Sequence, residues 1–141
     1  MTTVYRPDAV FVDGQLHFGR DLIVGDDGLV ADSAGFDPKV VTMPGRLILP
    51  GFVNAHSHAF QRVLRGKTEF IAKGHERDDF WSWREAMYAA ATELSPESMY
   101  SISHQAYTEM ARAGITTVGE FHYLHHQKDG TCYDDEHELS L

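Results

Sequence analysis

Two short strand-like segments, separated by helical sequence, constrain the fold of this chain more than any other feature. Residues 52–55 are mostly apolar and follow a Pro-Gly break, and residues 115–121 are rich in β-branched side chains, which is typical of strands. A strand, a helical connection and a second strand form a βαβ unit, which favours parallel pairing of the two strands. Parallel strands need cover on both faces, so we expect an α/β fold.

Two helices are expected between these strands. Residues 79–91 have a helical pattern, with Asp78 or Asp79 as the N-cap. The second helix begins after Ser95, where a capping serine is followed by a proline and an acidic residue in the first turn. Its apolar residues recur at helical spacing, and it is expected to end at Gly114.

Residues 1–48 are expected to form a separate small β module, a segment of a β-sandwich. An apolar segment runs into Asp13-Gly14, which is a strong hairpin signal. Residues 40–43 run into a break at Pro44-Gly45 before the next apolar residues. We therefore place a domain boundary after residue 48, with the α/β part in residues 49–141.

The first strand of the α/β part leads into the pair His56 and His58. Because alternate side chains of a strand point to the same face, both imidazoles are expected to project together from its C-terminal end. Imidazole is the commonest protein ligand for divalent metals, so the pair predicts half of a metal site. Catalytic zinc sites usually need three protein ligands, so at least one more must come from elsewhere.

A second polar cluster follows the other strand, at residues 120–126. The C-terminal ends of parallel strands carry the active site in α/β folds, so both clusters are expected at one rim. Tyr123 and Gln61 are candidates for substrate contact, although spacing alone does not distinguish this from a structural role. Arg84, beside two tryptophans, either forms ion-pair or cation–π contacts or clamps a substrate carboxylate in two-pronged fashion.

Composition argues against several classes of protein. The 141 residues carry a net charge of −9, which disfavours a nucleic-acid partner because phosphate binding needs clustered Lys and Arg. No apolar stretch reaches the roughly 20 residues that a membrane helix needs, so no membrane partner is expected. The N-terminus does not resemble a secretory signal. The single cysteine, Cys132, rules out a disulfide framework, and we expect a cytoplasmic location.

Several motifs together resemble one family. Residues 49–52 followed by His56-Ser57-His58 are similar to the start of the barrel in the amidohydrolase superfamily, and the β module before them is similar to its N-terminal sandwich segment. Four motifs narrow the resemblance to the formimidoylglutamate deiminases, the iminohydrolases of histidine degradation: residues 56–62, 80–85, 94–97 and 120–126.

This resemblance implies a fold. An N-terminal small β-sandwich segment would be followed by the first βαβ portion of a TIM-like (β/α)8 barrel. Such a barrel needs eight strands over roughly 250 residues. We therefore expect the chain to be truncated relative to it, as the front of a longer protein.

The resemblance also implies roles for individual residues. His56 and His58 match two metal ligands of the family, and zinc is the expected ion. Gln61, Arg84 and Tyr123 match positions that contact the anionic substrate, N-formimino-L-glutamate. The family's reaction is water attack on the formimino carbon, which releases ammonia and leaves N-formyl-L-glutamate. Zinc would supply hydroxide for it near neutral pH.

No catalytic residue of the family matches a position within this chain. Its remaining metal ligands and its general acid and base correspond to positions beyond residue 141. We therefore expect the chain alone to lack deiminase activity, which ammonia release that scales with the purified chain and vanishes with a chelator would refute. Homodimers are common in the superfamily, so the resemblance allows one here, although no residue pattern indicates it.

Two other functions stay open. Another amidohydrolase, such as an aminohydrolase acting on a purine or an imidazolonepropionase-like enzyme, would share the histidine pair but would not need Arg84 for a dicarboxylate. A non-catalytic fragment acting as an interaction module would expose strand edges and an apolar sheet face, and would therefore tend to associate.

Overall fold

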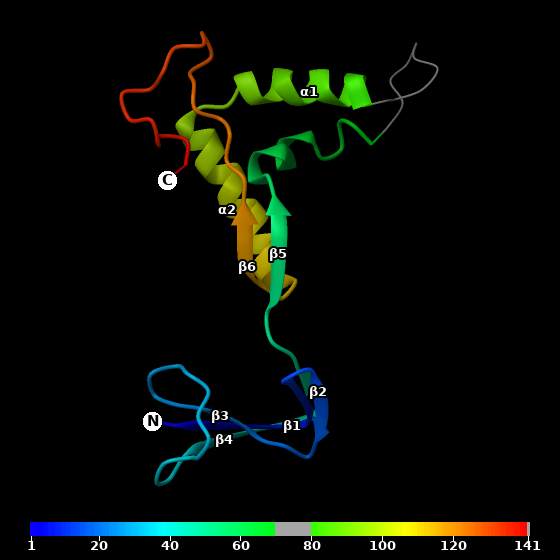
Figure 1. The fold of residues 1–141 in the computed structure, drawn as a ribbon, viewed down its shortest axis with the longest axis vertical. Coiled ribbons are helices and arrows are strands. Elements are labelled where there is room, and N and C mark those ends of the chain that lie inside the picture. The colour runs from blue at the N-terminus through cyan, green and yellow to red at the C-terminus, as the bar shows by residue number, and fades with distance from the viewer. Residues whose placement is uncertain (70–79, 141) are drawn as a thin grey trace. The chain divides into compact units, whose positions relative to one another are not determined.

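The computed structural model of this chain describes residues 1–69 and 80–140. It divides into two compact units, Met1–Pro50 and Gly51–Leu141 (Figure 1). The first unit is a β-sheet, and the second combines two parallel strands with helices. The mixed α/β character predicted from the sequence is therefore present. In the described part of the chain, no helix is long and apolar enough to cross a membrane.

The first unit is built around one long central strand. This strand, β1, pairs antiparallel with β2 and β3 and parallel with β4. The buried residues Val4, Ala9 and Val10 all lie on β1, because it has neighbours on both edges. The four strands are β1 (Thr3–Val12), β2 (Gln15–Phe18), β3 (Leu22–Val24) and β4 (Lys39–Ile48). They form one sheet, and it is the one sheet of the described residues in this unit.

Two turn signals in this unit have different outcomes. The hairpin predicted at Asp13-Gly14 is present, with positive φ at both residues (53° and 74°), as a tight two-residue turn requires. The break expected at Pro44-Gly45 is wrong, because β4 continues through it as a bulge. The backbone N–H of Gly45 donates to the carboxylate of Asp8 on β1 at 3.0 Å. That contact with another strand holds the bulge within the sheet.

The second unit contains the predicted βαβ arrangement. Its two strands, β5 and β6, pair in parallel, and both helices lie between them in sequence. Strand β5 extends to Ser57, two residues beyond the predicted end, and therefore includes His56. The expected caps Asp78 and Asp79 lie outside the described residues. The elements are β5 (Phe52–Ser57), the 3-10 helix η1 (Ala59–Leu64), α1 (Phe80–Thr92), α2 (Pro96–Arg112) and β6 (Ile115–Glu120).

Helix α2 begins and ends as its sequence predicts. Ser95 is the N-cap, and its side chain accepts from the Ser98 backbone N–H while the Ser98 hydroxyl accepts from the Ser95 N–H. This reciprocal capping satisfies two donors that a helix N-terminus otherwise leaves unpaired. Gly114 follows the helix with a φ of 87°, and this left-handed conformation turns the chain into β6.

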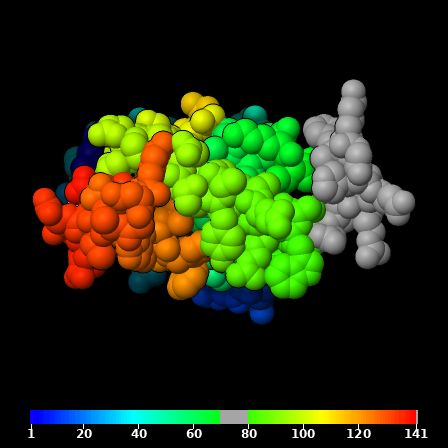
Figure 2. Space-filling model, turned by 90° about the horizontal axis from the view of Figure 1, so that it is seen from above, coloured from blue at the N-terminus to red at the C-terminus, as the bar shows by residue number. Residues whose placement is uncertain are grey.

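A hydrophobic core lies between η1, the two helices and the segment after β6. Helix α1 and that segment lie side by side at the surface (Figure 2), where Lys128 and Glu93 form an ion pair at 2.6 Å. Near its end the described chain forms a turn, in which the Ser140 N–H donates to the His137 carbonyl. The buried core residues are Phe60, Leu64, Met87, Leu94, Met99 and Leu139.

Candidate metal and substrate site

The two predicted metal ligands converge at the end of β5. The Nε2 atoms of His56 and His58 are 3.0 Å apart, and their ring centroids are 4.8 Å apart at an interplanar angle of 82°. His56 is exposed and His58 is half-buried. The imidazoles therefore face one another through the nitrogens that would bind a metal, at a place that solvent reaches.

Simple strand alternation is not the whole cause of this convergence. The register pairs Asn54 with Val118 and Ser57 with Glu120, so three steps along β5 match two along β6. The extra residue is a bulge, which re-aims the side chains around it. In addition, His58 lies just outside β5, as the N-cap of η1 with φ −136° and ψ 82°. The prediction of a shared direction holds, but the bulge and the turn produce it.

A hydrogen bond to the backbone fixes the orientation of the His58 ring. Its Nδ1 lies 2.9 Å from the backbone carbonyl oxygen of Phe121. Because a carbonyl only accepts, Nδ1 must carry the proton, and Nε2 is left with a lone pair directed at His56. This carbonyl–histidine arrangement is typical of metal-ligating imidazoles.

The spacing of the two nitrogens fits one divalent cation. Two imidazole nitrogens at about 2.0–2.1 Å from zinc, at a tetrahedral angle, lie about 3.3 Å apart, close to the observed 3.0 Å. Within residues 1–69 and 80–140, no group of three or more His, Cys, Asp or Glu side chains could hold a metal ion. The described residues therefore contain two candidate ligands, where a catalytic zinc site usually has three.

Two of the three predicted substrate residues meet next to the histidine pair. The Nε2 of Gln61 donates to the Tyr123 hydroxyl at 2.9 Å, and the Tyr123 ring lies 5.1 Å from that of His58. Both Gln61 and Tyr123 also contact the thioether of Met87 on α1, at 3.4 Å and 3.5 Å. Residues from η1, α1 and the segment after β6 thus form one side of the site.

Within the described part of the chain, Arg84 contacts aromatic side chains of its own helix, α1. Its guanidinium is 5.7 Å from the Trp81 ring centroid and 5.3 Å from that of Tyr88, and its Nη2 donates to the Tyr88 hydroxyl at 3.3 Å. The cation–π alternative raised by the sequence is therefore present. Arg84 precedes Met87 by three residues on α1, and this spacing places the two side chains on one face of the helix.

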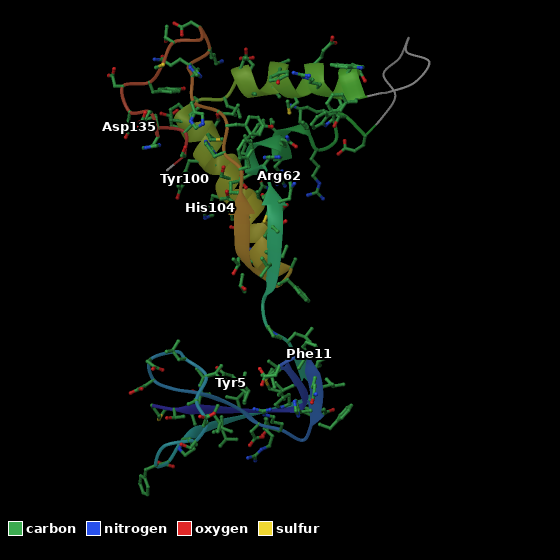
Figure 3. All side chains as sticks on the ribbon, in the orientation of Figure 1. Tyr5, Phe11, Arg62, Tyr100, His104 and Asp135 are labelled. Atoms are coloured by element: carbon green, nitrogen blue, oxygen red, sulfur yellow. The ribbon has the colours of Figure 1, made fainter. Side chains whose placement is uncertain are left out.

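An ion-pair network joins η1 to α2 at a cavity that both histidines also line. Arg62 (labelled in Figure 3) pairs with Glu109 at 2.6 Å, and Arg65 reaches the same carboxylate at 3.4 Å. The hydrogen bond from Arg62 is the main cause that holds the pKa of Glu109 below its usual value. Arg62, Glu109 and both histidines line a cavity of about 450 Å³.

Sequence reasoning missed the residues that support the histidines. The Glu120 carboxylate accepts the Ala59 backbone N–H at 2.7 Å, the Phe121 carbonyl holds His58, and Met87 lies between Gln61 and Tyr123. The predicted parallel pairing of the two strands could have located these residues, since it brings the end of β6 beside the end of β5.

The remaining histidines after β6 do not join the pair. His122 is half-buried, and burial, followed by the nearby His125, lowers its pKa. His125 and His126 are exposed. His126 pairs with Cys132, a free exposed thiol, through an isolated backbone bridge.

Known proteins share both the sequence and the fold of this chain. It is 52% identical over all 141 residues to formimidoylglutamate deiminase of Pseudomonas aeruginosa, of which it covers 31%. It is 26% identical over 130 residues to 8-oxoguanine deaminase of the same organism, covering 87% of this chain and 28% of that protein. The chain thus spans less than a third of the length of these curated relatives.

Solved structures agree on the fold. An amidohydrolase from Brucella melitensis matches 98% of this chain and 30% of its own, with a TM-score of 0.74 and 32% identity. The atrazine chlorohydrolase TrzN from Arthrobacter aurescens, solved with zinc, matches 82% of this chain and 28% of its own, with a TM-score of 0.60 and 21% identity. The model of the amidohydrolase family matches residues 47–138, which include the histidine pair and both parallel strands. This chain belongs to the amidohydrolase family.

Proposed function

We propose that this chain contributes metal- and substrate-binding residues to a formimidoylglutamate deiminase, which hydrolyses N-formimino-L-glutamate to N-formyl-L-glutamate and ammonia. The observation that carries the proposal is the contact of Gln61 with Tyr123 at 2.9 Å, beside the ring of His58. Residues expected to bind substrate thus adjoin those expected to bind metal. The 52% identity to the Pseudomonas aeruginosa deiminase supports this choice of substrate.

His56 and His58 would hold the metal ion, and zinc suits their donor set. Two neutral imidazoles with Nε2 atoms 3.0 Å apart match the ligands and spacing that zinc prefers. A bound zinc ion brings the pKa of a water molecule close to neutrality. The chain's own part is to keep the Nε2 lone pair of His58 available, which the Phe121 carbonyl does by holding the proton on Nδ1.

Tyr123 and Gln61 would bind the polar groups of the substrate. The Tyr123 oxygen accepts from Gln61, while among the described residues its own proton is directed at the Met87 sulfur at 3.5 Å. Thioether sulfur is a weak acceptor, so a substrate carboxylate or imine nitrogen would replace it favourably. The second amide proton of Gln61 could then bind the same substrate group, since an amide nitrogen has two donors.

Arg84 would bind a carboxylate of the glutamate part of the substrate. A guanidinium forms two parallel hydrogen bonds with a carboxylate. Among the described residues, Arg84 lies against two aromatic faces and donates to one hydroxyl. Binding of a carboxylate would replace the weaker hydroxyl contact and leave the aromatic faces in place.

A chimera tests this proposal directly. Residues 1–141 would replace the matching 31% of the Pseudomonas aeruginosa deiminase, and ammonia release from N-formimino-L-glutamate would be measured with zinc present. We expect activity within about tenfold of the unmodified enzyme. Hydrophobic substitutions between the two sequences should cost little stability where they keep the core volume and the hydrophobic pattern. The matched control is the same chimera with His56→Ala and His58→Ala. A folded, zinc-loaded chimera without activity would contradict the proposal.

A further inference from the structure

The carboxylate of Glu120 binds the backbone directly after His58. Its Oε1 accepts the Ala59 N–H at 2.7 Å, which joins the last residue of β6 to the first residue of η1. Hydrogen bonds to an ionised acceptor are roughly twice as strong as neutral ones. Because Ala59 is buried, solvent does not readily replace this acceptor.

Phe121, the next residue, contacts both Ser57 and His58. Its N–H donates to the Ser57 carbonyl at 2.9 Å, and its own carbonyl lies 2.9 Å from Nδ1 of His58. Together with the bond from Glu120 to Ala59, these contacts fix three consecutive residues with His58 at their centre. The direction of the His58 ring therefore depends on the end of β6.

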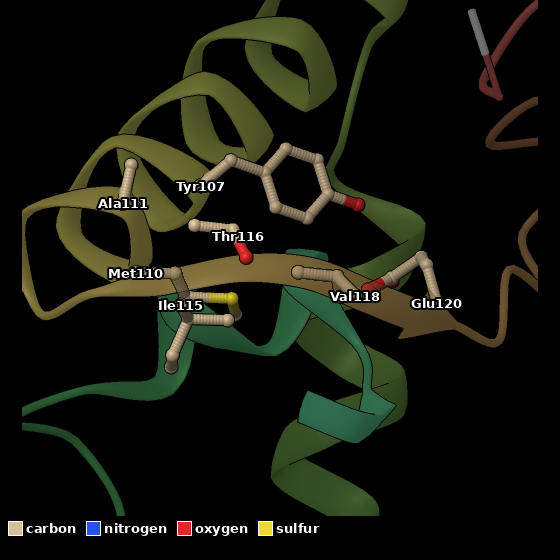
Figure 4. Close-up of a pocket in the computed structure, with 7 residues that line it drawn as sticks. All are labelled: Tyr107, Met110, Ala111, Ile115, Thr116, Val118 and Glu120. Atoms are coloured by element: carbon tan, nitrogen blue, oxygen red, sulfur yellow. The ribbon is translucent and has the colours of Figure 1, made fainter. Parts of the chain in front are cut away.

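Packing alone does not account for a carboxylate at position 120. Its second oxygen, Oε2, is buried and has no hydrogen-bond partner among the described residues. The hydroxyl of Tyr107 is directed toward this end of β6, in a cavity of about 570 Å³ (Figure 4). Burial is the main cause that raises the pKa of Tyr107, followed by the charge of Glu120 and a side-chain hydrogen bond with it, so the phenol stays protonated. A partly satisfied buried carboxylate is costly, and an apolar side chain would fill the space at lower cost.

We propose that Glu120 is a positioning residue for the histidine pair: it fixes the backbone around His58 so that Nε2 faces His56. The inference rests on the proposed metal-binding function of that pair. The same turn also carries Gln61, whose N–H donates to the His58 carbonyl at 2.9 Å. Glu120 therefore sets both the metal ligand and the residue that reaches Tyr123.

The test uses NMR of the ¹⁵N-labelled chain with two readouts. The first is the imidazole nitrogen shifts of His58 without metal, which report its tautomer, and the second is the Kd for Zn²⁺ by titration. Glu120→Ala should move the His58 signals toward a mixture of tautomers and raise the Kd about 10–100-fold, as loss of groups that orient ligating histidines does. Glu120→Gln retains an acceptor oxygen and should restore most of both.

The control is Glu93→Ala, which removes a carboxylate paired with Lys128 and should change neither readout. If Glu120→Ala keeps the wild-type His58 signals and Zn²⁺ affinity, the positioning role is wrong. If the wild-type chain does not bind Zn²⁺ but Glu120→Ala still shifts His58, the metal function fails and the positioning role stands.

A second variant covers failure of Glu120→Ala to fold. Ala59→Pro removes the same hydrogen bond from the donor side, because proline has no N–H and is tolerated at a first helical position. The same shift of the His58 signals is expected, and unchanged signals in this folded variant would overturn the inference.

Discussion

The Nε2 atoms of His56 and His58 lie 3.0 Å apart, although only His56 belongs to β5. In the absence of metal, the nitrogens share one proton: His58 offers a lone pair, since its Nδ1 faces the Phe121 carbonyl, and His56 donates to it. A cation that replaces this proton would find both lone pairs already directed at one point. This preorganisation lowers the cost of ordering the ligands.

Replacement of either histidine should abolish zinc binding by this chain. His56→Ala or His58→Ala leaves one imidazole, and a single imidazole is a weak zinc ligand by comparison with a chelating pair. Isothermal titration with Zn²⁺ would measure the loss, and EDTA should reverse binding to the wild type. His17→Ala, on β2 of the other unit, is the matched control, and equal loss in that variant would refute a specific site.

Local signals predicted much of the fold. The turn at Asp13-Gly14 and the cap at Ser95 depend on residues within a few positions of one another, so sequence reasoning locates them. The break expected at Pro44-Gly45 was wrong because the decisive contact, from Gly45 to Asp8, spans 37 residues. Bulges held by another strand give no local signal.

In the candidate site too, the sequence predicted the local features but not the long-range contacts. The spacing of His56 and His58 predicted that they would converge, but not the β-bulge or the Phe121 carbonyl that direct them. Contacts of this kind need the register of the parallel pair, which depends on packing over the whole βαβ unit. The support from Glu120 is 61 residues away from Ala59, and therefore only the structure reveals it.

The Tyr123 hydroxyl should matter for substrate binding more than for folding. In the chimera, Tyr123→Phe should raise KM for N-formimino-L-glutamate about tenfold, the loss of one hydrogen bond to a charged group, with a similar unfolding midpoint. Tyr133→Phe, a partly buried tyrosine against the same core, is the matched control. An unchanged KM in Tyr123→Phe would remove this residue from the substrate site.

Arg84 distinguishes a glutamate-type substrate from a purine. In the chimera, Arg84→Ala should raise KM for N-formimino-L-glutamate roughly 10–100-fold, because a two-pronged carboxylate contact is lost. Arg84→Lys should recover little, since an ammonium cannot reproduce the planar fork. If Arg84→Ala leaves the affinity unchanged, the residue is only the cation–π partner of Trp81 and Tyr88 seen here, and the deiminase proposal loses its substrate clamp.

Gly51 should be intolerant of any side chain. A Cβ at this position would overlap the side chain of Thr116 on β6, so Gly51→Ala should lower the free energy of unfolding by about 1–3 kcal/mol. Urea unfolding followed by the fluorescence of Trp81 and Trp83 measures this. The cost should shrink when Gly51→Ala is introduced into a Thr116→Gly background. An equal cost in both backgrounds would show that close packing against Thr116 is not its cause.

The pairing of Glu109 with Arg62 should make stability depend on pH in one direction. The pKa of Glu109 is lowered in the folded chain, mainly by the hydrogen bond from Arg62. Its contribution is therefore present above the ordinary pKa of 4.5 and is lost as pH falls through the folded value. Glu109→Gln should be less stable than the wild type at pH 7, and the two should converge by about pH 3. Urea unfolding across this range measures the difference, with Glu85→Gln on the exposed face of α1 as control. A gap between wild type and Glu109→Gln that persists undiminished at pH 3 would show that the ion pair is not its source.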